Sequence, residues 1–177
     1  AVLGSSKNVY CSADTLYIVG VGKRGGEYSI ISSFDLSNGG ISYRSSGSVE
    51  GSLISQQSMN EYDGMFRIAT RVTDKNGVSS VSVYVLDESL TSVNGAGQLY
   101  PEGNVSAVRF EDRYARIIDS TSGESVIVLD LAANPPMLAS TLMGNSAYLY
   151  AYSDTMLMGV GRSDDGGVTL TMYSSEN

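Results

Sequence analysis

One order of short segments recurs along this chain and limits the folds open to it. Each copy contains an apolar run, a turn with an aspartate, a second run, a glycine-rich turn and a third run. The turn aspartates are separated by 49, 49 and 42 residues, and they are Asp14, Asp63, Asp112 and Asp154. Such self-similarity is typical of repeat architectures, in which each repeat buries its apolar faces against its neighbours.

The apolar residues alternate with polar ones over short runs, which is the period of a β-strand with one buried face. Clear examples are "YSIISSFDL" (28–36), "MFRIATRV" (65–72) and "VSVYVLD" (81–87). A fourth run follows in the first three copies, at residues 41–49, 90–99 and 136–142. An all-β chain of four-stranded antiparallel units with a period of about 40 to 50 residues predicts the blades of a β-propeller.

These repeats predict a single propeller segment over residues 1–177. The expected blades, of which the last is incomplete, cover residues 8–49, 54–99, 104–142 and 146–177. Closed propellers contain about four to eight blades. Because the sequence starts at Ala1 and not at a methionine, we expect a segment of a longer natural protein, or an arc that pairs with another chain. Exposed apolar faces on the terminal blades would favour self-association.

The charge balance argues against two classes of partner. Lys and Arg total 11 against 19 Asp and Glu, which gives a net charge of −8. This charge repels phosphate backbones and anionic lipid head groups, so neither nucleic acid nor a membrane surface is an expected partner. No run approaches the roughly 18 apolar residues of a membrane-spanning helix, so membrane insertion is not expected. Abundant Ser, Gly and Tyr with scarce Lys favour an extracellular β protein.

The chain contains no histidine and one cysteine, Cys11. The usual base of serine and cysteine nucleophiles, which is also the commonest metal ligand, is therefore missing. A lone cysteine forms no internal disulfide and no thiolate zinc cluster. Without a neighbouring cationic run, Cys11 is expected to be a small buried apolar residue and not a nucleophile.

Two glycine-containing motifs resemble ligand loops but favour hairpin turns. "GVGKRG" (20–25) fits G-x-G-x-x-G, yet the run that follows it alternates like a strand, whereas a dinucleotide site needs a helix there. "TDKNGV" (73–78) gathers oxygen atoms but lacks the bidentate glutamate of a calcium loop. We expect no cofactor and no metal site, with weak surface calcium binding at such turns as the alternative.

Several separated stretches resemble a known family. They are "GSVEGSLISQQSMNEYDGMFRIATRV" (47–72), "VYVLDESLTSVNGAGQLYPEGNVSAVRF" (83–110), "VLDLAANPPMLASTLMGNSAYLYAY" (128–152) and "LMGVGR" (157–162). In order and spacing these stretches are similar to bacterial secreted proteins that carry a C-terminal β-propeller domain and have no established activity. The resemblance implies a secreted or surface-exposed bacterial protein, of which this chain is a central portion. It implies no catalytic residue.

The candidate site residues are charged side chains near the turns of the second and third repeats. Alternation places Arg67 on a strand face that a neighbouring blade would cover, and a buried guanidinium needs carboxylate or carbonyl partners. Glu61 is the expected partner. In the third repeat Arg109 takes the same placement, beside Glu111 and Asp112. We expect structural ion pairs between strands or blades; the alternative is that these groups line a channel and bind an anionic or polar ligand.

The sequence thus predicts a non-catalytic extracellular binding or scaffolding module. Its partner would be a protein or a glycan, recognised by loops on one rim or by exposed tyrosines. One alternative is part of an extracellular hydrolase acting on a polysaccharide or peptide. In that case missing blades would supply some of its carboxylates, because the acids of this chain are dispersed among turns. A second alternative is an arc that dimerises to close a ring.

Overall fold

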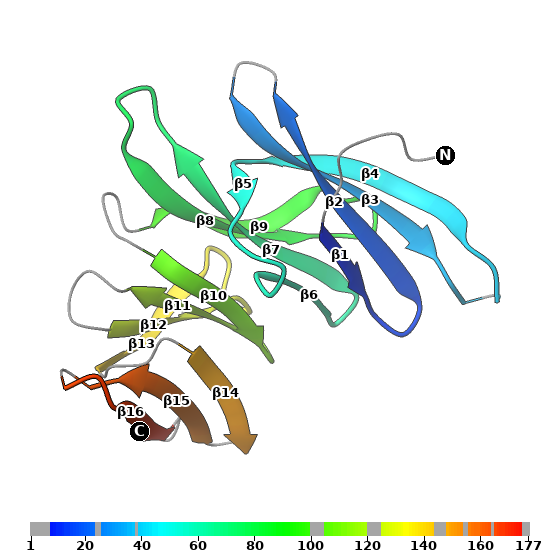
Figure 1. Cartoon of the computed structure of the whole chain (residues 1–177). Coiled ribbons are helices and arrows are strands. Elements are labelled where there is room, and N and C mark those ends of the chain that lie inside the picture. The colour runs from blue at the N-terminus through cyan, green and yellow to red at the C-terminus, as the bar shows by residue number, and fades with distance from the viewer. Residues whose placement is uncertain are drawn as a thin grey trace. The chain divides into compact units, whose positions relative to one another are not determined.

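The chain folds into antiparallel β-sheets that follow one another along the sequence (Figure 1). The computed structural model describes residues 8–23, 26–37, 39–99, 105–119, 125–143, 148–153, 156–163 and 165–174. These residues form strands and turns but no helix, which confirms the all-β prediction. They accordingly contain no helix of the length and apolarity that crossing a lipid bilayer requires.

Two sheets make up the first compact unit, residues 1–102. Blade 1 has the strand order β1-β2-β3-β4. Its strands are β1 (Asn8–Cys11), β2 (Thr15–Lys23), β3 (Glu27–Asp35) and β4 (Ser42–Glu50). In blade 2, β5 and β6 both pair with β7, and β8 and β9 follow. Its strands are β5 (Ser52–Leu53), β6 (Met59–Tyr62), β7 (Met65–Thr73), β8 (Ser79–Leu86) and β9 (Ser92–Leu99).

The second compact unit, residues 103–177, holds the other two sheets. Blade 3 contains β10 (Val105–Glu111), β11 (Tyr114–Asp119), β12 (Ser125–Asp130) and β13 (Met137–Met143). Blade 4 contains β14 (Tyr148–Ser153), β15 (Met156–Arg162) and β16 (Val168–Ser174). The described sheets thus span residues 8–50, 52–99, 105–143 and 148–174. That all four belong to one segment over residues 1–177 stays a prediction.

Tight turns join the first and second strands and fix the pairing register of the blades. In blade 2, Asp63 has a φ of 52° and Gly64 a φ of 72°. Two left-handed residues in succession are typical of the two-residue hairpin turn that matches strand twist. Tyr62 therefore pairs with Met65, and each further pair lies one residue farther from the turn on both strands. Asp112 has a φ of 44° in the equivalent turn of blade 3, while Asp154 lies outside the described residues.

The first strand of blade 2 is interrupted between β5 and β6, which the alternation pattern did not predict. The chain leaves the sheet at residues 54–58 and then pairs with β7 again. The amide of Ile54 donates to the carbonyl of Ala69 at 3.3 Å, and the amide of Ala69 donates to the carbonyl of Ser58 at 2.9 Å. From this excursion Gln56 Nε2 reaches the carbonyl of Val9 in β1 at 3.1 Å.

The core of the first unit lies between blades 1 and 2. Blade 1 contributes Tyr17, Val19, Ile31 and Val49, and blade 2 contributes Met59, Phe66, Ile68, Leu86 and Leu90. At its centre the rings of Tyr17 and Phe66 stack at 4.1 Å between centroids and 15° between planes. Each blade contributes the side chains of one face of its sheet to this core, since successive side chains along a strand point to opposite faces.

Hydroxyl groups also join blades 1 and 2 by donating to backbone carbonyls of the other blade. Thr70 Oγ1 donates to the carbonyl of Glu50 at 2.7 Å, and Ser45 Oγ donates to that of Glu88 at 2.7 Å. The backbones approach closely at Gly47, where an added Cβ would lie 2.8 Å from the Cβ of Leu90. Glycine is required there because any larger residue would force the two blades apart.

The core of the second unit joins blades 3 and 4 in a similar way. Ala107, Ile118 and Val126 pair across β10, β11 and β12 and share one face. Tyr173 of β16 packs into the same cluster. On the opposite face of blade 3, Ile117 is fully buried as well.

Candidate functional site

Glu61 connects the first turns of blades 1 and 2. Its Oε2 atom accepts hydrogen bonds from the Tyr17 hydroxyl at 2.8 Å and from Ser12 Oγ at 3.0 Å. Ser12 lies in the turn between β1 and β2, and its Oγ also accepts the amide of Thr15 at 3.1 Å. The carboxylate thereby holds the turn and the second strand of blade 1 against the first strand of blade 2.

Tyr17 is the group most affected electrostatically in this cluster. Burial raises the pKa of its hydroxyl well above the usual range, and the hydrogen bond to the Glu61 carboxylate raises this pKa further. Both effects disfavour the phenolate, because burial removes its hydration and the neighbouring carboxylate repels its charge. Tyr17 therefore stays protonated in the folded chain and acts as a hydrogen-bond donor.

The raised pKa of Tyr17 predicts a loss of stability in alkaline solution. In the unfolded chain a tyrosine ionises at about pH 10. In the folded chain Tyr17 keeps its proton at that pH, because its pKa is raised. Its contribution is complete below the unfolded pKa and falls as the pH rises through and above it. Urea unfolding between about pH 8 and pH 11 should show a steeper decline for the wild type than for Tyr17→Phe. Tyr43→Phe, at an exposed tyrosine, is the matched control, and equal slopes for all three chains would contradict the prediction.

Arg67 is buried, as the alternation predicts, with 2% of its surface exposed. Its Nε donates to Asn60 Oδ1 at 2.8 Å, and its Cζ lies 4.7 Å from the centroid of the Tyr62 ring. The expected pairing with Glu61 does not form, because the register places Asn60 opposite Arg67 and Glu61 opposite Phe66. Directly paired residues share a face, so Glu61 points to the other side of the sheet.

In blade 3, Arg116 and not Arg109 occupies the position of Arg67. Both are the third residue of the second strand of their blade, and 49 residues separate them, the spacing of the turn aspartates. Arg116 is buried and forms an ion pair through Nη1 with Glu111 Oε2. Burial lowers the pKa of Arg116, while the charge of Glu111 opposes this shift. Arg116 is absent from the residues predicted above, although the repeat spacing of 49 residues from Arg67 identifies it.

The structure thus brings together only part of the predicted charged set. Arg109 pairs with Arg116 across β10 and β11. Glu111 is the last residue of β10, directly before the turn to β11. Asp112 is exposed in that turn. Next to it, Arg113 Nη2 pairs with Asp130 Oδ2 at 3.2 Å. Whether any of these groups binds a ligand stays a prediction.

Aspartate side chains stiffen the turns between third and fourth strands. Asp87 Oδ1 accepts hydrogen bonds from the amide and the hydroxyl of Ser89, at 2.9 and 2.6 Å, and from the amide of Thr91 at 3.0 Å. Asp35 accepts the amide of Ser37 at 2.8 Å. The hydroxyl and amide donors of Ser37 and Ser89 hold the pKa of each carboxyl below its usual range. Both turns are therefore fixed by hydrogen bonds to their own backbone.

The two glycine-containing motifs form hairpins, as predicted. Residues 20–23 end β2, and β3 starts at Glu27, which pairs with Lys23, so no helix follows. Asp74 accepts the amides of Asn76 and Val78, both at 2.8 Å, and closes the turn on itself. In the part of the chain that the structure describes, no three carboxylate or cysteine side chains gather as metal ligands would.

The prediction that Cys11 is buried is wrong. Cys11 is exposed because it pairs with Leu16 on the face of blade 1 that points away from the core shared with blade 2. Composition indicated a small apolar residue, but only the register decides which face of the strand carries it.

Comparison with known proteins identifies the fold. The model of the family described as Beta propeller domain matches residues 1–173. The chain belongs to this family. The predicted propeller class, built here from antiparallel sheets of three to five described strands, is thereby confirmed. The match shows the family alone; that the chain comes from a secreted bacterial protein stays a prediction.

Two similar proteins are archaeal, and both are uncharacterised. One, from Methanocaldococcus jannaschii, is 30% identical over 134 residues, which is 73% of this propeller chain and 22% of that protein. The other, from Archaeoglobus fulgidus, is 33% identical over 130 residues, which is 71% of this chain and 20% of that protein. The chain thus spans about a fifth of the length of these relatives, and neither supports a bacterial origin.

Among solved structures, a GH43 endo-arabinanase from Bacillus licheniformis is similar over 97% of this propeller chain and 96% of that enzyme. The sequence identity is 11% and the TM-score is 0.23. Because the TM-score is this low, the similarity bears on neither fold nor activity.

Proposed function

We propose that this propeller segment is a non-catalytic binding module that works outside the cell and meets a protein partner through one end of its blades. In blades 1 and 2 the connections after the first and the third strands lie at the same end of the sheet, because the strands are antiparallel and in sequence order. We call this end of the first unit the aspartate rim; its acidic residues are Asp14, Asp35, Asp63, Asp87 and Glu88.

The single observation that carries this proposal is that the rim is both rigid and acidic. Its turns are short and hydrogen-bonded to their own aspartates at Asp35 and Asp87, so little flexibility would be lost on binding. The turns themselves contain no lysine or arginine. Arg44, on β4, lies 3.6 Å from Asp35 and neutralises one carboxylate of the rim. Tyr62, exposed beside Asp63, adds an amphipathic ring of the kind enriched at interfaces.

The remaining negative charge favours a partner with basic groups. A protein segment rich in lysine or arginine fits this chemistry better than an acidic polysaccharide, which the rim would repel. An extracellular location is supported by the composition, in which Ser, Gly and Tyr are frequent and Lys occurs three times, and by the resemblance to secreted proteins.

A binding experiment with a matched control tests the rim. The immobilised chain is probed with a panel of basic, neutral and acidic peptides and with a glycan array. We expect binding of basic peptides that weakens with salt, and a loss of about tenfold in affinity for D63N/E88Q, since each exposed charge contributes modestly. Asparagine tolerates the left-handed conformation of Asp63. The control E27Q/E50Q removes two carboxylates from the opposite end of blade 1 and should bind like the wild type.

Other outcomes of the same experiment would reject the proposal. Binding of neutral glycans that D63N/E88Q does not weaken would favour recognition by exposed tyrosines elsewhere. Release of sugar or peptide fragments from a polymer would favour the hydrolase alternative, and equal losses for D63N/E88Q and E27Q/E50Q would show a nonspecific effect of net charge.

A further inference from the structure

We infer that Asp87, at the end of the third strand of blade 2, binds the guanidinium group of an arginine in the partner protein. This inference rests on the proposed function, because it specifies one contact between the aspartate rim and a basic partner. It is drawn from the equivalent aspartates of blades 1, 2 and 3, each described within its own blade. In blades 1 and 3 that aspartate binds an arginine of this chain.

The aspartates at the ends of the third strands share one hydrogen-bond pattern. They are Asp35, Asp87 and Asp130, each the last residue of its strand or the residue directly after it. In each, Oδ1 accepts the backbone amide two residues further along the chain, at 2.8, 2.9 and 2.9 Å respectively. The turn therefore fixes one carboxylate oxygen in the same way in all three blades. The other oxygen, Oδ2, is the one that a cation can approach.

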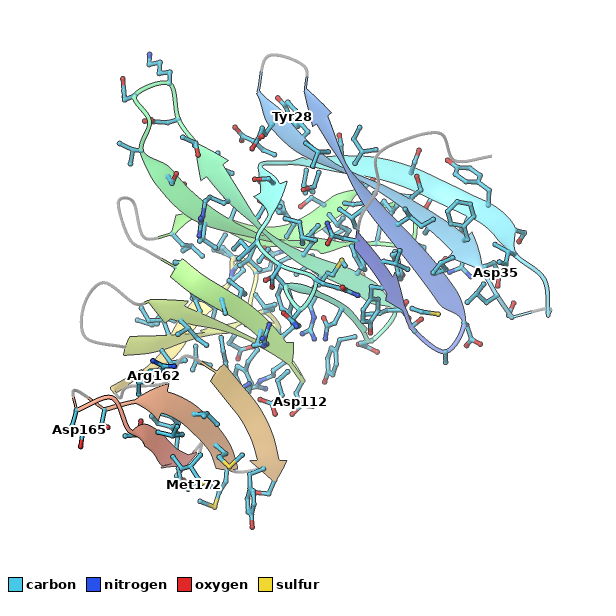
Figure 2. All side chains as sticks on the ribbon, in the orientation of Figure 1. Tyr28, Asp35, Asp112, Arg162, Asp165 and Met172 are labelled. Atoms are coloured by element: carbon cyan, nitrogen blue, oxygen red, sulfur yellow. The ribbon has the colours of Figure 1, made fainter. Side chains whose placement is uncertain are left out.

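In blade 1, Oδ2 of the aspartate binds an arginine from the fourth strand. Arg44 Nη2 lies 3.6 Å from Asp35 Oδ2, and Arg44 Nη1 donates to Thr15 Oγ1 at 3.3 Å. Arg44 is the extra residue of a β-bulge in β4, and a bulge can redirect a side chain. Here the bulge directs Arg44 toward the end of the sheet that carries Asp35, which Figure 2 shows opposite the end that carries Tyr28.

In blade 3, Oδ2 of the aspartate binds an arginine from a different element. Arg113 Nη2 lies 3.2 Å from Asp130 Oδ2. Arg113 is the second residue of the tight turn between β10 and β11, since Glu111 pairs with Tyr114. Two different elements thus bring a guanidinium to the same carboxylate oxygen. The preference for arginine therefore belongs to the aspartate and its turn, and not to one particular neighbouring strand.

In blade 2 the two positions that supply these arginines carry uncharged residues. Val93 is the extra residue of the bulge in β9 and follows Arg44 by 49 residues. Gly64 is the second residue of its tight turn and precedes Arg113 by 49 residues. Within the described part of the chain, Asp87 accordingly forms hydrogen bonds to its own turn but no ion pair. The arginine that completes this arrangement has to come from another molecule.

The neighbours of Asp87 favour arginine over lysine. Met65 lies beside Asp87, because the next residue of each strand pairs with the other. Met65 and Val93 are 37% and 44% exposed. A guanidinium is weakly hydrated and its flat faces pack on such side chains, whereas a lysine ammonium is strongly hydrated. Hydrogen bonds from the Ser89 hydroxyl and the turn amides hold the pKa of the Asp87 carboxyl below its usual range, so the carboxylate is charged at neutral pH.

The test is an NMR titration of the whole chain with two short blocked peptides, Gly-Arg-Gly and Gly-Lys-Gly. The amides of Ser89 and Thr91 donate to Asp87 Oδ1, so their chemical shifts report binding at this carboxylate. We expect Gly-Arg-Gly to shift both amides and to bind about threefold more tightly than Gly-Lys-Gly. The amide of Ser37 should change little, because Arg44 already binds Asp35.

Exchanges at the bulge position provide matched variants for this titration. V93R supplies the cation that blade 2 lacks and should lower the affinity for Gly-Arg-Gly about fivefold, as should D87N, which keeps the Oδ1 acceptor. V93Q controls for side-chain length and E27Q for the loss of one carboxylate, and both should bind like the wild type. R44V removes the arginine of blade 1, so Gly-Arg-Gly should now shift the Ser37 amide as well.

The outcomes separate this inference from the proposed function. The inference is overturned if Gly-Arg-Gly shifts neither the Ser89 nor the Thr91 amide, or if V93R and V93Q bind it equally. Basic peptides from the panel above that bind the rim with the same affinity in V93R as in the wild type would reject the inference and leave the proposed function standing. A response of the Ser89 amide to Gly-Arg-Gly, with no basic peptide of the panel bound, would support the inference and reject the proposed function.

Discussion

Phe66→Ala should lower the free energy of unfolding by about 3 to 5 kcal/mol, the range for removing a buried aromatic ring. Phe66 is buried in the core between blades 1 and 2 and stacks on Tyr17 at 4.1 Å. Stacked rings stabilise by roughly a further 0.5 to 1.5 kcal/mol beyond the buried area. Urea unfolding followed by circular dichroism measures the change, which should appear as a lower midpoint with little change in slope.

Phe34→Ala is the matched control for this prediction. Phe34 lies in β3 on the face of blade 1 that points away from the core shared with blade 2, and it contacts Tyr43 edge-on. Its removal should cost about 1 kcal/mol or less, since part of the ring is already in water. Equal losses for Phe66→Ala and Phe34→Ala would contradict the placement of the core between the blades.

Arg67→Ala is expected to lower the free energy of unfolding by about 2 to 4 kcal/mol. The long side chain is buried, so its removal leaves a cavity, and Asn60 Oδ1 loses the Nε donor that lies 2.8 Å away. The stacking of the guanidinium over the Tyr62 ring is lost as well. Urea unfolding at neutral pH checks the value.

Arg67→Met separates the cavity from the polar contacts. Methionine keeps most of the volume and needs no hydrogen-bond partner, and apolar replacement of a buried charge is often tolerated. We expect Arg67→Met to cost less than Arg67→Ala. A cost below about 1 kcal/mol for Arg67→Ala would instead mean that the guanidinium lies in water, as in a hydrated channel.

The fold was predictable because its signals are local and repeated. Strand alternation, the aspartate turns and their spacing all point to the same four-stranded unit. The break in the first strand of blade 2 was not predictable in this way. Residues 54–58 read as part of a loop with Ser and Gln, and only the paired hydrogen bonds to Ala69 show that the strand resumes opposite the same neighbour.

The candidate site was predictable in part, for reasons of register. Alternation alone assigns Arg67 to a covered face, but the partner depends on which residue of β6 lies opposite. The Asp63–Gly64 turn contains that information, because counting outward from it pairs Glu61 with Phe66 and Asn60 with Arg67. A shift of one residue moves a side chain to the other face. The Tyr17 hydroxyl as partner of Glu61 needed the packing of two blades, which no local pattern encodes.

The hydrogen bonds that join blades 1 and 2 through backbone carbonyls have a consequence for how such arrays evolve. The acceptors of Thr70, Ser45 and Gln56 are main-chain oxygens, and a main-chain oxygen is present whatever side chain its residue carries. Mutation of the accepting residues therefore leaves these bonds possible. A duplicated blade can diverge widely at those positions and still fit its neighbour, so that tandem copies lose their sequence similarity long before they lose their shape.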